Sequence, residues 1–253
     1  MAKAKATPSA FEVYAHEYDW MTNAAQRENY HRNEVAAIID RTQPERVLDA
    51  GCATGLTTKL FAERGIEAVG LDRSERMLEV AREKFAGSEL PVSFLGGEFE
   101  RLPRKLDGSF DLVVCLANSI TGVSTKTGLL NSLRSFRRVL RPGGRLVLQM
   151  LNYLAVQDGS LMPIRATENE GIVYARYSQR RGRKLAVHLV RIDLNQDPPT
   201  NEPFVHEFDN FTPDEVIRAS RRAGFKDIRR FADLYFKERF KKASRNLVLV
   251  AKA

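Results

Sequence analysis

Two aspartates and the small residues between them are the part of the chain best suited to bind a ligand. Asp49 ends a short apolar run and is followed by Gly51, Ala53 and Gly55. Residues without side-chain bulk suit a sharp turn and let the backbone approach a ligand closely. Asp72, 23 residues after Asp49, ends the next apolar run, where an acid can accept hydrogen bonds from two ribose hydroxyls. A tight turn with no ligand is the alternative for the glycine pair alone, and Asp72 favours a binding site.

The ligand expected at this turn is a nucleoside with a positively charged end. The glycine pattern is one residue short of the dinucleotide fingerprint G-x-G-x-x-G, and the P-loop lysine is absent. Asp49 stands at the mouth of the turn, where a carboxylate would repel phosphate and attract an ammonium group.

Strands and helices alternate around this turn and predict how it is positioned. The runs "DLVVCL" and "RLVLQM" suit strands buried on both faces, and the segments between strands show helical spacing of apolar residues. The fold class is therefore α/β, with an open, doubly wound and mostly parallel sheet that binds ligands at the carboxyl ends of its strands. The strands predicted in the first part of the chain are Arg46–Asp49, Ala68–Leu71, Val92–Leu95, Phe110–Leu116 and Arg145–Met150.

The whole chain, 1–253, is expected to form a single domain, with a helical segment before the core and a β-rich insert within it. Helical spacing predicts two helices before the first strand, and residues 1–42 are taken as a helical lid. Residues 43–150 and 209–253 form the predicted core, which closes with strands Phe225–Phe231 and Arg245–Ala251, at least one of them antiparallel. Residues 151–208 form a β-rich insert, in which a hairpin turns at Arg181–Arg183 and ends at Asp197–Pro199.

Composition limits the classes of function. The 253 residues carry a net charge of +8 and no apolar run long enough to cross a bilayer, and the basic start has no apolar core typical of a secretory signal. A cytoplasmic location without membrane association is therefore expected. Cys52 and Cys115 support neither a disulfide framework nor a cysteine metal site, so no metal is predicted. The basic pairs are scattered and indicate solvated surface rather than one nucleic-acid-binding stretch.

Taken together, the motifs resemble the class I S-adenosylmethionine-dependent methyltransferases over roughly residues 11–253. "VLDAGCATG" resembles the first motif of that family, with alanine in place of the usual middle glycine, and "VGLDRSERML" and "FLGGEFERLP" resemble the second and third. The resemblance implies a Rossmann-like seven-stranded sheet whose last strand is antiparallel, with S-adenosyl-L-methionine as cofactor and S-adenosyl-L-homocysteine as product. "CLANSI", "MLNY" and the insert look most like the small-molecule branch that includes glycine and sugar N-methyltransferases.

The resemblance also implies residue roles. Asp72 would bind the ribose, Arg73 and Met77 would lie beside the adenine, and Glu98 and Phe99 would contact its amine and ring. The tyrosines of the lid would approach the sulfonium, although both are equally suited to be core aromatics. The cofactor-binding residues implied are Tyr14, Tyr18, Asp49, Ala50, Gly51, Cys52, Ala53, Gly55, Asp72, Arg73, Met77, Gly97, Glu98, Phe99 and Leu116.

Methyl transfer from a sulfonium requires little from side chains besides positioning, because the methyl group is already activated. A base is needed only when the acceptor arrives protonated, as an alkyl amine does at neutral pH. The catalytic residue is left unknown, with His188, His206 and Tyr153 as candidates. Both histidines are equally consistent with ordinary strand residues of the insert.

The acceptor is expected beyond the ends of the fourth and fifth strands. The resemblance places Asn118, Ser119, Asn152 and Tyr153 beside the substrate, where amides and hydroxyls suit a polar small molecule. Three arginines of the insert are placed to hold a carboxylate, or else they face solvent; they are Arg165, Arg176 and Arg191.

Two alternatives to a small-molecule methyltransferase remain open at this point. The basic charge allows an RNA or DNA methyltransferase, but the end of the fourth strand reads Leu116–Ser119 and lacks the Pro-Pro-aromatic sequence typical of enzymes that methylate an exocyclic base amine. A non-catalytic protein that binds S-adenosylmethionine is the other alternative. The protein is expected to be a monomer or a homodimer.

Overall fold

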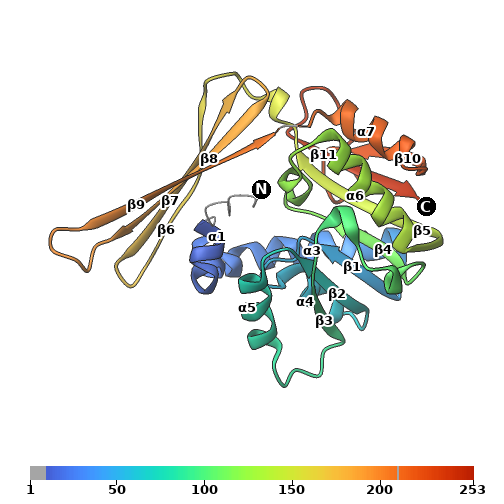
Figure 1. Cartoon of the computed structure of the whole chain (residues 1–253), viewed down its shortest axis with the longest axis horizontal. Helices are drawn as coiled ribbons and strands as arrows, with labels where there is room; N and C mark the ends of the chain where they lie inside the picture. The colour runs from blue at the N-terminus through green and yellow to red at the C-terminus, as the bar shows by residue number, and fades with distance from the viewer. Residues whose placement is uncertain (1–9, 210) are drawn as a thin grey trace, which may run out of the picture.

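A seven-stranded sheet forms the centre of the protein. The structure is a computed structural model and describes residues 10–209 and 211–253. The strands lie in the order β10-β11-β5-β4-β1-β2-β3 (Figure 1). β11 is antiparallel to both of its neighbours, β5 and β10, and the other pairs are parallel, so the predicted α/β sheet with an antiparallel last strand is confirmed. The strand bounds are β1 Arg46–Ala50, β2 Glu67–Asp72, β3 Val92–Gly96, β4 Phe110–Cys115, β5 Leu140–Leu151, β10 Lys226–Phe231 and β11 Asn246–Lys252.

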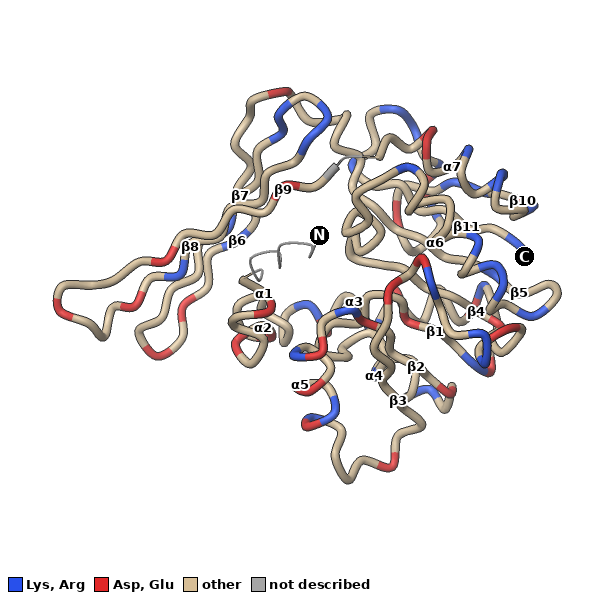
Figure 2. The backbone as a smooth tube through the Cα atoms, viewed as in Figure 1, with Lys and Arg blue, Asp and Glu red and all other residues tan. Residues whose placement is uncertain are grey.

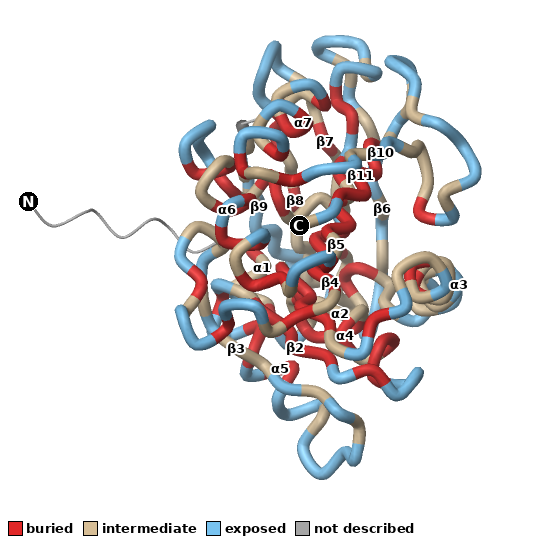
Figure 3. The backbone as a smooth tube through the Cα atoms, turned by 90° about the vertical axis from the view of Figure 1, so that its right-hand side faces the viewer, coloured by how far each residue is buried: buried red, intermediate tan, exposed pale blue. Residues whose placement is uncertain are grey.

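Helices bury both faces of this sheet. α6 (Lys126–Val139) and α7 (Pro213–Arg222) pack on one face, and α3 (Ala24–Thr42) and α4 (Leu56–Ala62) pack on the other. Val113 of β4 belongs to the first apolar cluster, whereas its neighbours Leu112 and Val114 belong to the second. The continuous apolar run of β4 follows from this, because side chains on both sides of the strand are buried (Figure 3).

Shorter helices complete the core. α5 (Glu75–Phe85) packs against β2 and β3, and Ser74 caps its first turn. Short 3₁₀ helices follow β3, β4 and β5; they are η2 Phe99–Arg101, η3 Arg104–Leu106, η4 Ser119–Gly122 and η5 Tyr153–Ala155.

The N-terminal segment differs from the prediction. The first of the two expected helices is instead three short pieces, α1 (Ala10–Val13), η1 (Ala15–Glu17) and α2 (Tyr18–Met21), and only α3 is long. The chain leaves helical geometry at Tyr14 and again at Asn23, which adopts left-handed dihedral angles. The part of the proposed lid that covers residues 1–9 lies outside the described residues.

The insert is a separate four-stranded antiparallel sheet rather than a hairpin. Its order is β6-β7-β8-β9, with β6 Leu161–Asn169, β7 Ile172–Arg181, β8 Lys184–Asp193 and β9 Thr200–Asp209. The predicted hairpin is β7 and β8, joined at Gly182. The hairpin ends before Asp197–Pro199, as predicted, and this segment connects β8 to the further strand β9. Pro163 and Pro203 obscured the two outer strands in the sequence, although proline is tolerated on edge strands.

The N-terminal pieces pack against one face of the insert. Met21 and Tyr174 are buried in a shared apolar cluster, and the Thr167 hydroxyl donates to the Met21 carbonyl oxygen at 3.2 Å. Figure 1 shows the insert projecting from the core with α1 beside it. Within residues 10–209 and 211–253, none of the helices combines the length and the apolar character that a membrane crossing requires.

Candidate functional site

The turn after β1 is held close to the end of β4. Gly51 has φ +90°, and a Cβ atom at this position would lie 2.5 Å from Cβ and Oγ of Ser119. The Gly51 amide donates to the Leu71 carbonyl oxygen of β2 at 2.7 Å. Glycine is therefore required at position 51 both by its dihedral angles and by the approach of Ser119. These contacts bring the carboxyl ends of β1, β2 and β4 together at one point.

Asp72 is fixed beside this turn by two backbone amides. Its Oδ2 accepts from the Ala53 amide at 2.9 Å, and its Oδ1 accepts from the Ser74 amide at 2.9 Å. Ala53 adopts φ +48°, which turns its amide toward the carboxylate. Each carboxylate oxygen retains a further lone pair, so Asp72 can still accept hydrogen bonds from two hydroxyls.

Asp49 lies beneath the turn rather than at its mouth. Its side chain is 2% exposed, and its Oδ2 accepts from the Thr58 hydroxyl of α4 at 2.7 Å. Burial raises the pKa of Asp49 to about 7, the negative charge of Asp72 adds to the rise, and the Thr58 hydrogen bond opposes it. Asp49 was expected to be an exposed anion, whereas it is a buried carboxyl group whose pKa is close to neutral pH.

The remaining residues of the first motif line the same turn. Ala50 and Cys52 are buried, and burial raises the pKa of the Cys52 thiol, so this cysteine is an inert structural residue. Gly55 begins α4 with φ +85°, and a Cβ atom there would meet the Phe94 ring at 2.9 Å. Gly55 is therefore required for packing of the helix rather than for approach to a ligand.

The residues implied to surround the adenine lie along the ends of β2 and β3. Met77 is buried, and Gly97 donates its amide to the Asp72 carbonyl oxygen at 2.9 Å. Glu98 is exposed, and the Phe99 ring packs against Phe136 at 5.4 Å. Arg73 is exposed at the end of β2, and its Nη1 lies 3.4 Å from the Gly122 carbonyl oxygen of η4. The structure thus brings these residues to one edge of the sheet.

The two tyrosines of the lid lie in different places. Tyr18 packs in a cluster with Met77 and Ala53, next to the turn. Tyr14 instead contacts the insert, where its hydroxyl donates to Glu202 at 2.5 Å and its ring packs edge-on against Phe204. Burial and Glu202 raise the pKa of Tyr14 to about 12. Only Tyr18 is placed near the first motif.

Asn118 connects the ends of β4 and β5 through its side chain. Its Nδ2 donates to the Tyr153 hydroxyl at 2.9 Å, and its Oδ1 accepts from the Leu151 amide at 3.0 Å. Ala117 and Asn118 both have positive φ, which turns the chain sharply after the buried Leu116. Asn118 therefore positions Tyr153, and its side-chain hydrogen bonds are already used within the protein.

Asn152 and Tyr153 are both buried, with different partners. The Nδ2 of Asn152 donates to the carbonyl oxygens of Lys242 and Ser244, so this side chain points toward the loop before β11. Burial raises the pKa of Tyr153, which keeps its hydroxyl protonated at neutral pH. Tyr153 is consequently unsuited to act as a general base.

The two histidines of the insert lie on opposite faces of its sheet. His206 pairs with Val187 across the β8–β9 ladder, whereas His188 pairs with Tyr177 and Val205, one residue out of step. His188 stacks on Tyr177 at 4.5 Å. Burial lowers the pKa of His206, and the positive charge of Arg73 lowers it further, which places His206 near the end of β2.

The arginines of the insert also have different surroundings. Arg191 forms an ion pair with Glu17 of the lid, with 3.4 Å between Nη2 and Oε1, and its Cζ lies 4.9 Å from the Tyr14 ring centre. Arg165 donates from Nη1 to the Gln26 side chain at 2.7 Å. The Nε of Arg176 is buried and has no hydrogen-bond partner among the described residues.

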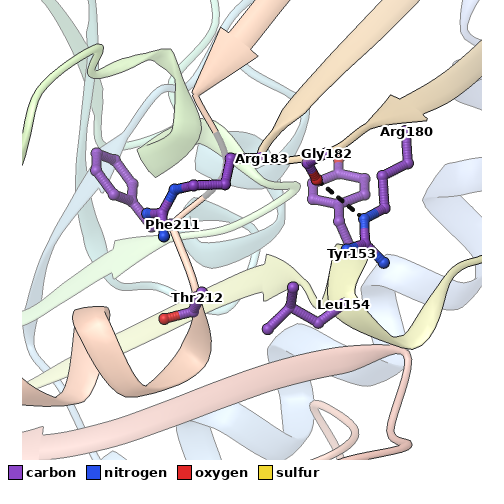
Figure 4. A pocket seen from close by; sticks show the side chains of 7 residues that line it. All are labelled: Tyr153, Leu154, Arg180, Gly182, Arg183, Phe211 and Thr212. Atoms are coloured by element: carbon purple, nitrogen blue, oxygen red, sulfur yellow. Dashed lines mark hydrogen bonds between the residues drawn. The ribbon is translucent and has the colours of Figure 1, made fainter. Parts of the chain in front are cut away.

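A cavity of about 260 Å³ lies where the insert joins the core (Figure 4). Tyr153 and Leu154 of η5 line it from the core, and Arg180 and Arg183 line it from the insert. The Arg183 guanidinium pairs with Glu215 of α7 at 2.9 Å, which fastens the insert to the core beside this cavity.

Several residues of the site carry no recognisable motif. Thr58 bonds to Asp49 from the following helix, nine residues away, and Glu17 acts through partners far away in the sequence. The Thr54 hydroxyl donates to Asp19 at 2.5 Å, and Lys84 donates to the same carboxylate at 2.5 Å, so the lid is tied to the turn. Nothing in the local sequence identifies the pairs of Glu17 and Asp19, because they join the lid to distant parts of the chain.

The fold and the site define the class of protein. The sheet order and the antiparallel β11 match the Rossmann-like methyltransferase fold. Residues 47–144 match the family model described as a methyltransferase domain. The resemblance inferred from the motifs is confirmed.

The chain is similar in sequence and in fold to several known methyltransferases. YqeM of Bacillus subtilis, a methyltransferase by name, is 33% identical over 138 residues, which are 54% of this chain and 55% of the relative. The CcbJ methyltransferase from Streptomyces caelestis gives a TM-score of 0.75 at 24% identity and covers 88% of this chain and 89% of that chain. CalS10, an amino pentose methyltransferase from Micromonospora echinaspora whose structure contains bound S-adenosylmethionine, gives 0.69 at 23% identity over 100% of both chains. The chain spans about half the length of the curated relatives it matches.

Proposed function

We propose that this protein transfers the methyl group of S-adenosylmethionine to a nitrogen or oxygen atom of a small polar molecule and releases S-adenosylhomocysteine. The observation that carries this proposal is the Asp72 carboxylate, held by two backbone amides beside the Gly51 turn with lone pairs left for hydroxyl groups. The methyltransferase domain at residues 47–144 supports it. So does the likeness to CalS10, which acts on an amino pentose.

The residues of the turn fit this cofactor in charge and shape. Asp72 would bind the ribose hydroxyls, and Met77 and Phe99 would flank the base. Asp49 would attract the ammonium group of the cofactor once ionised. S-adenosylmethionine supplies a methyl group already activated on a sulfonium. Holding the acceptor in line with it is worth up to about 7–11 kcal/mol, so positioning carries most of the catalysis.

His206 is the residue best placed to accept a proton from the acceptor. It lies on the face of the insert that carries Tyr174 and Arg191, which contact the lid. Its lowered pKa keeps the imidazole neutral at pH 7, as a general base requires. His188 stacks on the opposite face, and Tyr153 stays protonated.

Calorimetry with S-adenosylhomocysteine tests the binding assignment. Asp72→Ala removes two charged hydrogen bonds to the ribose and should weaken binding at least about tenfold. Asp214→Asn removes a negative charge from the exposed first turn of α7 and should bind like the unchanged protein. Equal affinity of Asp72→Ala and the control would remove the ribose assignment.

Labelled cofactor tests the acceptor class. With methyl-tritiated S-adenosylmethionine and a metabolite extract, label should appear in the low-molecular-weight fraction. Lysines and arginines are spread over the insert and the core, with acidic residues among them (Figure 2). Label in added RNA or DNA would instead support the nucleic-acid alternative. Tight binding with no label in any fraction would support a non-catalytic cofactor-binding protein.

A further inference from the structure

Three arginines gather where the lid meets the insert. Arg176 of β7 and Arg165 of β6 are direct cross-strand partners, so their side chains lie on one face of the sheet. Arg27, in the first turn of α3, is close enough for its charge to act on Arg176. Arg27 donates to the Thr22 hydroxyl at 2.8 Å, which directs it along the end of the lid.

The charge of this cluster is not neutralised. Within residues 10–209 and 211–253, none of Arg27, Arg165 and Arg176 pairs with a carboxylate, and the Nε of Arg176 is buried with no acceptor. Burial lowers the pKa of Arg176, as do the charges of the other two arginines. A desolvated guanidinium without a partner is unfavourable, because neither water nor a counter-charge compensates it.

Arg191, on the same face of the insert, shows the contrasting case. Its guanidinium pairs with Glu17, and Asp193 and Glu202 lie within 4.0 Å of its Nη1. Arg191 is the cross-strand partner of Tyr174, and Arg176 follows Tyr174 by two residues on β7. Carboxylates therefore surround Arg191, whereas none pairs with Arg176 nearby among the described residues. Arg191 holds the lid, and Arg176 is left open to a ligand.

The cluster faces the proposed methyl-transfer site. Arg176 lies on the face of the insert that carries Tyr174 and His206. The Tyr18 side chain is close enough to Arg176 to affect the pKa of that guanidinium, and the Tyr18 ring packs with Met77 and Ala53 next to the turn. A molecule between the turn and the insert would thus meet Arg176 at one end.

We propose that Arg176, with Arg165 and Arg27, binds an oxyanion of the methyl acceptor, a carboxylate or a phosphate. The planar fork of a guanidinium donates two parallel hydrogen bonds to either group, which an ammonium cannot do. The inference rests on the proposed function only in identifying the bound anion as part of the acceptor.

The fluorescence of Trp20 reports on the contact between the lid and the insert. Trp20 is the only tryptophan of the protein, and its ring centre lies 5.0 Å from that of Tyr174. Its emission is followed while sodium malonate or sodium phosphate is added at constant ionic strength, with S-adenosylhomocysteine present. The unchanged protein should give a saturable response to at least one of these anions. Malonate alone identifies a carboxylate site, phosphate alone a phosphate site, and both an unselective oxyanion site.

Arg176→Gln should weaken this response about tenfold or more. The matched control is Arg181→Gln, which removes the same charge from the same strand on the opposite face. Arg165→Gln, on the edge strand β6, provides a second test should Arg176→Gln unfold. No saturable response in the unchanged protein, or the same affinity after both substitutions in the cluster, would overturn the proposal.

Two further readouts separate this inference from the proposed function. Mass spectrometry of the labelled methyl product should find a carboxylate or phosphate, and a product with neither would overturn the inference while the methyl transfer stands. Absence of S-adenosylhomocysteine binding in calorimetry would overturn the proposed function. The anion titration repeated without that ligand would still decide whether the arginines form an oxyanion site.

Discussion

Replacing Asp49 with asparagine should make the protein more stable at alkaline pH and unable to bind its cofactor tightly. The Asp49 carboxyl is 2% exposed, and its pKa rises from 3.8 to about 7 because burial disfavours the charged form. Asparagine has nearly the same shape, and its Oδ1 can still accept from the Thr58 hydroxyl. The substitution removes the ionisation without opening a cavity.

The magnitude follows from the raised pKa. Between pH 3.8 and about 7 the folded state holds a proton that the unfolded state has lost, so the stability of the unchanged protein falls as pH rises. At about 1.4 kcal/mol for each tenfold change in the equilibrium constant, the cost above pH 7 reaches about 4 kcal/mol as an upper limit. The unpaired amide of asparagine opposes the gain by about 1–3 kcal/mol at every pH. The gain from Asp49→Asn should therefore grow by about 3 kcal/mol from pH 5 to pH 8.

Urea unfolding at pH 5, 6, 7 and 8 measures this change. Thr58→Val is the companion variant, because it removes the hydrogen bond that lowers the pKa of Asp49 and should extend the loss of stability to higher pH. On the proposed function, S-adenosylmethionine binds the ionised form, so its affinity should rise from pH 6 to pH 8 in the unchanged protein only. A free-energy difference between Asp49→Asn and the unchanged protein that does not vary with pH would show that the pKa of Asp49 is not raised in the folded state.

Three other perturbations follow from the geometry. Gly51→Ala should destabilise the protein by at least about 1 kcal/mol in urea unfolding, because its Cβ would lie 2.5 Å from Ser119 at φ +90°; unchanged stability would contradict this. Thr212→Ala removes the capping box of α7 and should cost about 1 kcal/mol without altering cofactor affinity, so a large change in affinity would count against a purely structural role. Glu17→Gln removes the ion pair with Arg191 and should speed hydrogen exchange in residues 10–21, whereas equal exchange would show that apolar packing alone holds the lid.

The central sheet could be predicted because its strands are buried on both faces. Such strands appear in the sequence as continuous apolar runs, and helical spacing separates them. The insert could be predicted only in part. Its inner strands β7 and β8 flank a clear turn at Gly182, whereas the edge strands β6 and β9 each contain a proline and many polar residues. Edge strands pair on one side only, so their sequences are less constrained.

The candidate site divides in the same way. Asp72 and the Gly51 turn follow from local spacing, since each position depends on a single strand end. The burial of Asp49 depends on how α4 packs over the core. The different positions of Tyr14, against the insert, and Tyr18, beside the turn, depend on how the lid packs. Short-range patterns contain no information on such contacts, which is why an exposed Asp49 was expected and a buried one is found.

Asp49 and Arg176 present the same physical situation with opposite sign. Each is an ionisable group that the fold desolvates and leaves without an oppositely charged partner among the described residues. Such groups lower the stability of the protein, and a bound ligand that supplies the opposite charge offsets this cost. On the functions proposed, the cofactor brings an ammonium group to Asp49 and the acceptor brings an oxyanion to Arg176. The cofactor is then anchored at the turn and the acceptor at the insert, and fixing the two molecules relative to each other is what in-line methyl transfer needs.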